Sequence, residues 1–116
     1  MSEARTPVGY AAQRRSERVL LDVPVVLFGE SLDHRPFREE TFTVTVSAHG
    51  ALLMLENRVA IGQKVRLANP GNWDEREAHV AYVGADHAGL AQVGIEFDQP
   101  SPQFWQVSSP PSNWKA

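Results

Sequence analysis

The sequence predicts an all-β fold, either an antiparallel barrel or a sandwich. Short stretches alternate apolar and polar residues with the period of two that is typical of half-buried strands. Turn-forming residues separate these stretches at intervals of roughly ten residues, and no segment carries a long helical period. With 116 residues, of which 42% are apolar, the chain has room for one compact domain with a buried core.

Six strands are expected, and closing them into a barrel would leave no unpaired strand edge. They cover residues 19–27, 42–46, 51–55, 64–67, 76–83 and 90–97. In the first, Pro24 indicates a sheet edge or a bulge, because proline has no backbone N–H to donate. In the second, Phe42 and the valines are expected to face the core and the intervening threonines the outside. The residues expected to be buried are Val23, Val25, Val44, Val46, Leu53, Val80, Ile95 and Phe97.

The chain is expected to divide into three parts. Residues 1–13 mix Ser, Thr, Pro, Gly and Ala without periodicity, which predicts a flexible leader. Residues 14–107 are expected to form the barrel domain, and residues 108–116 a Pro-rich tail. Ser101 can cap a helix and Pro102 can occupy its first position, so a short C-terminal helical turn is expected there.

Large aromatic residues follow the last expected strand. Phe104, Trp105 and Trp114 are expected to cover an opening of the barrel. Exposed aromatic residues can also anchor an interface, so a docking site is the alternative interpretation. Because Trp114 is the only large apolar residue beyond Val107, truncation after that point is expected to matter less than loss of Trp105.

Composition and charge exclude several classes of protein. Without cysteine, the chain has no disulfide, no Cys-ligated zinc and no thiol nucleophile. No window approaches the ~20 apolar residues that span a membrane, so we expect a cytoplasmic protein with no membrane partner.

The net charge of −3 argues against a partner that is a nucleic acid polymer. Through Arg18, four arginines and two glutamates give +2, and the seven cations and twelve carboxylates that follow give −5. An RNA-binding or single-strand-binding barrel needs a basic groove lined with aromatic residues, which this acidic body does not offer.

The sequence contains no pattern that predicts catalysis or metal binding. The four histidines, His34, His49, His79 and His87, are scattered without the spacing of a metal site. No nucleophile with an activating base, no carboxylate pair and no phosphate-binding glycine loop is recognisable. We therefore expect a protein that is not an enzyme, with no catalytic residue, metal or cofactor.

Three arginines precede the first expected strand. Arg14 and Arg18 stand four residues apart, with Arg15 between them. A guanidinium group binds phosphate oxygens through two parallel N–H donors and can also stack on a flat base, so this cluster suits a nucleotide. A solvated basic leader is the alternative interpretation, since short arginine clusters are common at domain entrances.

The second notable pattern lies at the end of the second expected strand, in Thr45-Val-Ser-Ala-His-Gly50. Ser47 carries a hydroxyl that can donate or accept a hydrogen bond, and Gly50 allows a ligand to approach the backbone closely. Gly50 is also expected to have the positive φ that a tight turn needs. An ordinary turn between two strands is the alternative.

Together the two patterns resemble the PilZ domain, a bacterial signalling module that binds cyclic di-GMP. Its hallmarks are R-x-x-x-R before the first strand and (D/N)-x-S-x-x-G after the second. Arg14 and Arg18 fit the first motif, Ser47 and Gly50 fit the second, and the resemblance covers roughly residues 14–97. It implies a six-stranded antiparallel PilZ-type β-barrel and a cyclic di-GMP site formed by Arg14, Arg15, Arg18, Thr45, Ser47 and Gly50.

One position departs from the family pattern, because Thr45 stands where the motif has Asp or Asn. That side chain helps to hold a guanine, and threonine offers one uncharged hydroxyl in its place. The loss should cost about 1 to 3 kcal/mol of binding free energy. Two functions therefore remain open. One is a cyclic di-GMP receptor that acts on an unknown protein partner, and the other is a ligand-independent adaptor that binds a protein through its acidic barrel face or aromatic tail.

Overall fold

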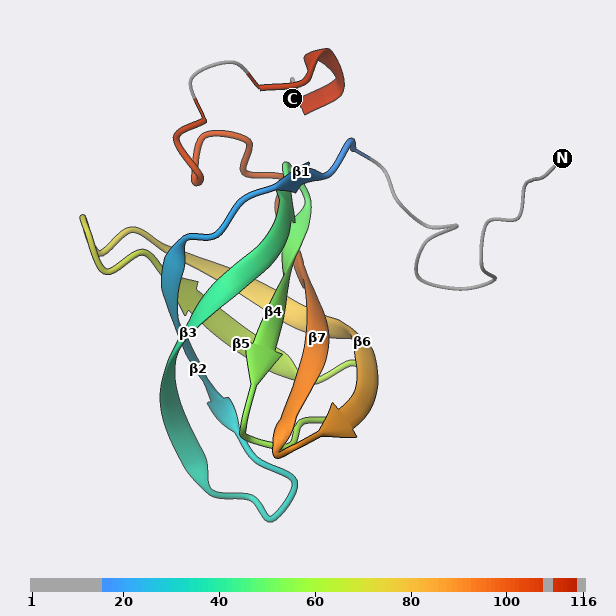
Figure 1. Ribbon diagram of the computed structural model, residues 1–116. Coiled ribbons are helices and arrows are strands. Elements are labelled where there is room, and N and C mark those ends of the chain that lie inside the picture. The colour runs from blue at the N-terminus through green and yellow to red at the C-terminus, as the bar shows by residue number, and fades with distance from the viewer. Residues whose placement is uncertain (1–15, 108–109, 115–116) are drawn as a thin grey trace, which may run out of the picture.

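The computed structural model describes residues 16–107 and 110–114, and it confirms an all-β fold (Figure 1). The strands are β1 Val19–Leu20, β2 Pro24–Glu30, β3 Pro36–Ser47, β4 Gly50–Leu55, β5 Lys64–Ala68, β6 Glu75–His87 and β7 Leu90–Phe97. Six of them, β2 to β7, form the predicted antiparallel barrel, and the two-residue β1 is an additional strand. The expected leader, residues 1–13, lies outside the described residues.

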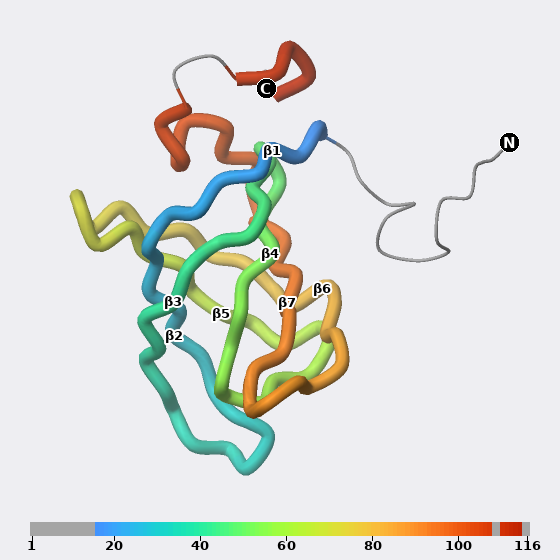
Figure 2. The backbone as a smooth tube through the Cα atoms, in the orientation of Figure 1, coloured from blue at the N-terminus to red at the C-terminus, as the bar shows by residue number. Residues whose placement is uncertain are grey.

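Strand pairing closes the barrel in the order β3-β2-β5-β6-β7-β4, with β4 pairing back onto β3. The backbone trace shows how β3 curves so that its first part pairs with β2 and its last part with β4 (Figure 2). The short β1 pairs with the end of β3, where Val19 lies opposite Val46 and Leu20 opposite Thr45. As a result, the residues just before β1 lie beside the β3–β4 turn.

The first expected strand is divided in two. Residues 21–23 interrupt it, and β2 begins at Pro24, which has no N–H for a ladder hydrogen bond. The interruption still follows β3, because Leu21 N–H donates to the Val44 carbonyl and Thr43 N–H to the Val23 carbonyl. The expectation of an edge or bulge at Pro24 thus corresponds to a real break in the strand.

The prediction for the inward face of β3 is wrong in its first part. Thr41 and Thr43 are buried, whereas Phe42 is 59% exposed. Both buried hydroxyls are satisfied, since Thr41 donates to the Met54 carbonyl and Thr43 to the Leu21 carbonyl. A register shift between Thr43 and Thr45 then moves the following residues to the other face.

Most of the predicted core is confirmed. The predicted residues that are buried are Val25, Val46, Leu53, Val80, Ile95 and Phe97. Val23 and Val44 are only half-buried, contrary to the prediction. Val23 lies in the break before β2 and packs against the edge of the core, and Val44 lies at the register shift of β3. Both errors follow from irregularities in strands that the sequence pattern presents as regular.

The C-terminal segment covers one end of the barrel (Figure 1). Phe104, Trp105 and Trp114 are all buried and belong to the core cluster, which confirms that they pack on the barrel. Phe104 and Trp105 stack edge to face at 4.9 Å between ring centroids. No helix forms at Ser101, and the single C-terminal helical element in the described residues is a 3₁₀ turn at Ser112–Trp114. We call this covered end the capped end.

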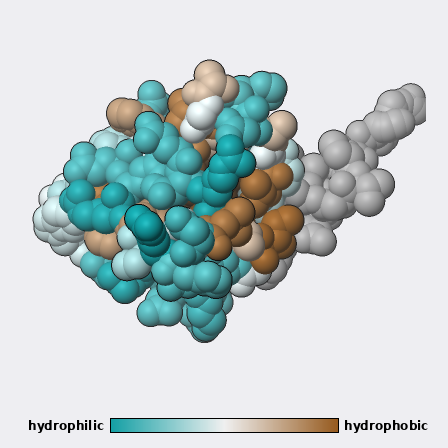
Figure 3. Space-filling view, turned by 90° about the horizontal axis from the view of Figure 1, so that it is seen from below, coloured by the Kyte–Doolittle hydropathy of each residue, from teal (hydrophilic) through white to brown (hydrophobic). Residues whose placement is uncertain are grey.

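The opposite end of the barrel, which we call the open end, consists of hairpins and loops. Leu32 in the β2–β3 connection is 56% exposed, and Leu90 at the start of β7 is also exposed. A cavity of about 190 Å³ lies there, lined in part by Leu55, Val59 and Val83. Seen from this end, hydrophobic and hydrophilic residues share the surface (Figure 3). In contrast to the capped end, no aromatic segment is packed over it in the described residues.

Candidate functional site

The predicted site residues within the described chain gather at the capped end. Arg18 directly precedes β1, Thr45 and Ser47 are among the last three residues of β3, and Gly50 begins β4. The antiparallel pairing of Val19 with Val46 brings the Arg18 backbone beside Ser47. The remaining two predicted residues, Arg14 and Arg15, lie outside the described residues.

Thr45 and Ser47 lie on the same face of β3, because side chains two residues apart in a strand point the same way. Thr45 lies between Leu20 of β1 and Leu52 of β4, its partners in the two ladders. Leu20 is 81% exposed, and Thr45 itself is half-buried. A ligand on this face would therefore contact an apolar side chain and a hydroxyl, with the Arg18 segment at its border.

Ser47 has a structural role in the turn. Its hydroxyl accepts a hydrogen bond from His49 N–H at 3.1 Å, and its side chain is mostly buried. Its carbonyl accepts a hydrogen bond from the Trp105 indole N–H at 2.8 Å. A serine is thus useful here for the stability of the turn and for attachment of the C-terminal segment, in addition to any ligand contact.

Gly50 is required for close packing of two strands and not for a positive φ, so the sequence-based explanation was wrong. Positive φ among described glycines occurs at Gly62 and Gly89. A Cβ atom on Gly50 would lie 2.0 Å from the carbonyl oxygen of Ile95 in β7. Any side chain would push β4 away from β7, and the residue must be glycine whether or not a ligand binds.

The segment after β7 is attached to the β3–β4 turn through the backbone. Ser101 N–H donates to the Ala48 carbonyl at 2.8 Å, and Phe97 N–H donates to the His49 carbonyl at 2.7 Å. These bonds satisfy carbonyl groups of the turn that bears the second motif. The C-terminal segment is therefore part of the structure of the site.

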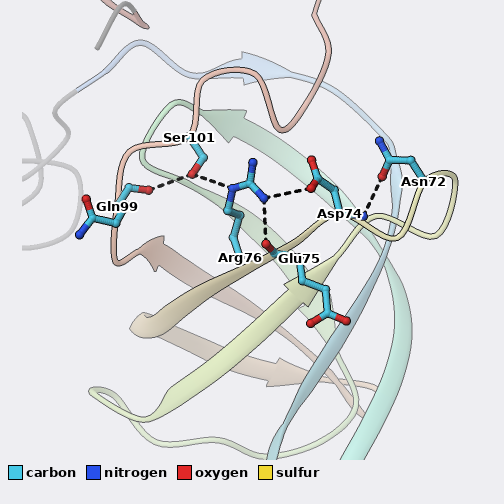
Figure 4. Close-up of polar contacts among 6 residues, drawn as sticks. All are labelled: Asn72, Asp74, Glu75, Arg76, Gln99 and Ser101. Carbon is cyan, nitrogen blue, oxygen red and sulfur yellow. Dashed lines mark hydrogen bonds and ion pairs between the residues drawn. The ribbon is translucent and has the colours of Figure 1, made fainter.

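Arg76 of β6 attaches the same segment from the other side (Figure 4). Its Nε–H donates to the Ser101 hydroxyl at 3.2 Å, and its Nη1–H donates to an Asp74 carboxylate oxygen at 3.1 Å. The guanidinium also lies over the Phe104 ring, 5.5 Å from its centroid. This arginine thus stabilises the capped end and lies outside the predicted motif.

The N-terminal segment of the site is held by side chains that the sequence analysis did not single out for this role. Ser16 is buried, and its hydroxyl lies 3.0 Å from His49 Nδ1. Glu17 links this segment to the C-terminal segment. Its N–H donates to Asn113 Oδ1 at 3.1 Å, and its carbonyl accepts a hydrogen bond from the Trp114 indole N–H at 2.6 Å. Since the partners are up to 97 residues apart, no local pattern predicts these contacts.

On the barrel body, arginines are largely engaged by carboxylates. Arg38 pairs with Glu40 at 3.0 Å and Arg66 with Glu75 at 2.9 Å. Each such exposed pair is worth little for stability, but it reduces the local positive potential. In the sequence, three arginines stand together just before β1, the strand that pairs with the end of β3.

Within residues 16–107 and 110–114, no group of three His, Asp or Glu side chains is arranged to hold a metal ion. In that same part of the chain, no helix is long and apolar enough to cross a membrane.

Comparison with known proteins agrees with this arrangement. No curated protein matches the chain. The family model described as PilZ domain matches residues 12–106, which include both sequence motifs and the whole barrel. PilZ domains are binding and adaptor modules in cyclic di-GMP signalling and are not catalytic domains. The chain belongs to the PilZ domain family.

Proposed function

We propose that this PilZ domain is a receptor for cyclic di-GMP, which binds at the capped end, and that it acts on a protein partner without catalysing a reaction. The observation that carries the proposal is the pairing of β1 with β3, which sets the Arg18 segment beside Thr45 and Ser47. Two sequence patterns about thirty residues apart are thereby joined at one site, as ligand binding by both requires.

The arginines supply the attraction for the ligand. Arg18, with Arg14 and Arg15, would contact phosphate oxygens and stack on guanine, because guanidinium groups do both. Since the rest of the chain is acidic, these contacts provide most of the electrostatic attraction for a dianionic nucleotide. Binding should therefore weaken as salt screens the charges.

Thr45 makes this receptor a weak one. A carboxylate or amide at this position would present acceptor oxygen to guanine N–H groups, and threonine presents a single hydroxyl. A loss of about 1 to 3 kcal/mol corresponds to roughly ten- to a hundredfold in affinity. We therefore expect a dissociation constant of about tens of micromolar or more for cyclic di-GMP.

A ligand-independent adaptor is the second candidate function, and a specific observation favours it. Ser47 and Gly50 each have a structural reason to be present, in the turn and in the β4–β7 packing. Both motif residues would therefore persist in a chain that no longer bound nucleotide. In that case the acidic barrel wall would contact a partner protein.

Calorimetric titration with cyclic di-GMP separates the two functions. Thr45→Asp should strengthen binding about ten- to a hundredfold, because a carboxylate restores two acceptor oxygens. Arg18→Ala should abolish binding in both backgrounds. Arg38→Ala removes an exposed arginine from the first half of β3 and is the matched control, with affinity unchanged.

Failure of both the wild type and Thr45→Asp to bind at millimolar ligand in low salt would contradict the receptor function. The adaptor function would then replace it. A gain in Thr45→Asp that persists without Arg18 would show that the two motifs do not form a single site.

A further inference from the structure

The two C-terminal tryptophans hold the two halves of the site in the same way. The Trp105 indole N–H donates to the carbonyl of Ser47, in the second motif. The Trp114 indole N–H donates to the carbonyl of Glu17, which lies between the arginines of the first motif. Both rings are buried, so each hydrogen bond is shielded from competing water.

Asn113 completes the attachment of Glu17. Its side-chain oxygen accepts the Glu17 N–H, so both backbone polar groups of Glu17 bond to the neighbouring residues Asn113 and Trp114. This pair of residues lies beyond residue 106, where the match to the family model ends. The attachment is therefore a feature of this chain that the family match does not account for.

The attachment fixes the backbone on both sides of Arg18. On one side Glu17 is bonded to the 3₁₀ turn, and on the other Val19 is paired with Val46 of β3. We propose that Asn113 and Trp114 are positioning residues, which hold Arg18 beside Thr45 and Ser47 before cyclic di-GMP binds. This inference rests on the proposed function, because it assigns a role in binding to residues that do not contact the ligand.

The physical effect is a lower ordering cost. A free N-terminal segment would lose backbone and side-chain entropy when its arginine closed on the ligand, and a segment already held in place loses less. Each Glu17 hydrogen bond is of ordinary strength, so removing one should weaken ligand binding about three- to tenfold.

Two variants remove one hydrogen bond each and keep the rest of the chain. Asn113→Ala removes the acceptor for Glu17 N–H from an exposed side chain, and Trp114→Phe removes the indole donor but keeps an aromatic ring in the core. Asn69→Ala is the matched control. It removes a similar side-chain acceptor, which bonds Gly71 N–H at 2.8 Å in the β5–β6 connection.

Two readouts are needed on the full chain: amide hydrogen exchange at Glu17 and Arg18 without ligand, and calorimetric affinity for cyclic di-GMP. Both readouts should change in Asn113→Ala and Trp114→Phe, with faster exchange and about three- to tenfold weaker binding, and neither should change in Asn69→Ala. Asn113→Ala separates the hydrogen bond from the bulk of the buried ring, because it leaves Trp114 in place.

The outcomes distinguish this inference from the proposed function. If the wild type binds and the variants bind equally well or more tightly, the positioning role is overturned and the receptor function stands. Unchanged exchange at Glu17 in both variants would overturn it as well. If the wild type does not bind at all, the receptor function fails, and the positioning role for this ligand fails with it.

Discussion

The two ends of the barrel are built in different ways. The open end is closed by local turns, in which Ser31 N–H donates to the Arg35 carbonyl and Gly89 N–H to Asp86. At the capped end, hydrogen bonds join residues far apart in the sequence, such as Trp105 to Ser47 and Trp114 to Glu17. The open end also has contacts between separate hairpins, such as Leu32 N–H to the Arg58 carbonyl and Arg58 to Asp86. These contacts join neighbouring connections of the barrel, whereas the capped end forms only when both ends of the domain fold onto the barrel.

This difference supports the proposed location of the site. A ligand site assembled from two distant sequence segments needs long-range contacts to hold those segments together, and at the capped end such contacts join the two chain segments that carry the sequence motifs. The cavity at the open end is lined by Leu32, residues 55–59 and parts of β6 and β7, and it contains neither motif. The predictions below test this contrast, from the largest expected effect to the smallest.

Trp105→Ala should have the largest effect on stability. The side chain is buried against Phe97 and Phe104, and its indole bonds the Ser47 carbonyl. Removal of a buried tryptophan costs about 3 to 5 kcal/mol of unfolding free energy. Chemical denaturation measures this loss, and an unchanged midpoint would show that Trp105 is exposed in solution.

Truncation after Val107 should also destabilise the domain, by about 3 kcal/mol. The sequence predicts a smaller effect than that of Trp105→Ala, because Trp114 is the only large apolar residue removed, and in the structure that residue is 1% exposed. Thermal unfolding of the truncated chain, with Trp114→Ala in the full chain as a comparison, measures the effect. Equal stability of the truncated and full chains would mean that the 3₁₀ turn does not pack on the barrel.

Gly50→Ala should destabilise the domain by about 1 to 3 kcal/mol, because the new Cβ would overlap the Ile95 carbonyl. Gly71→Ala is a control in the β5–β6 connection, where the nearest atom to an added Cβ belongs to an Asn69 side chain, 3.2 Å away. Denaturant midpoints of the two variants provide the comparison. If both variants lost an equally small amount of unfolding free energy, close packing would not be the reason for glycine at position 50.

Leu32→Ser at the open end should have the smallest effect, about 0.5 kcal/mol or less, since the side chain is more than half exposed. Ligand affinity should also stay the same, because this residue lies at the opposite end of the barrel from Arg18. A large loss of stability, seen by the same denaturation measurement, would show that the open end is covered in solution.

The sequence was sufficient to predict the barrel, because β5, β7 and the start of β6 keep a regular alternation and their apolar faces are buried. It failed at β3, where satisfied threonine hydroxyls lie inside and a register shift follows Thr43. The site motifs could be recognised in the sequence because their residues stand at fixed spacing along the chain. The contacts of Asn113 and Trp114 with Glu17 could not be predicted, because nothing in either segment indicates its distant partner.

The most direct test of the account is to map where cyclic di-GMP binds, by following backbone amide resonances during titration. The account predicts that resonances of Arg18, Thr45 and Ser47 at the capped end shift together, with one common affinity, while those of Leu32 and Val59 at the open end stay unchanged. Shifts confined to the open end, or no shift at Arg18 and Thr45 up to millimolar ligand, would contradict it.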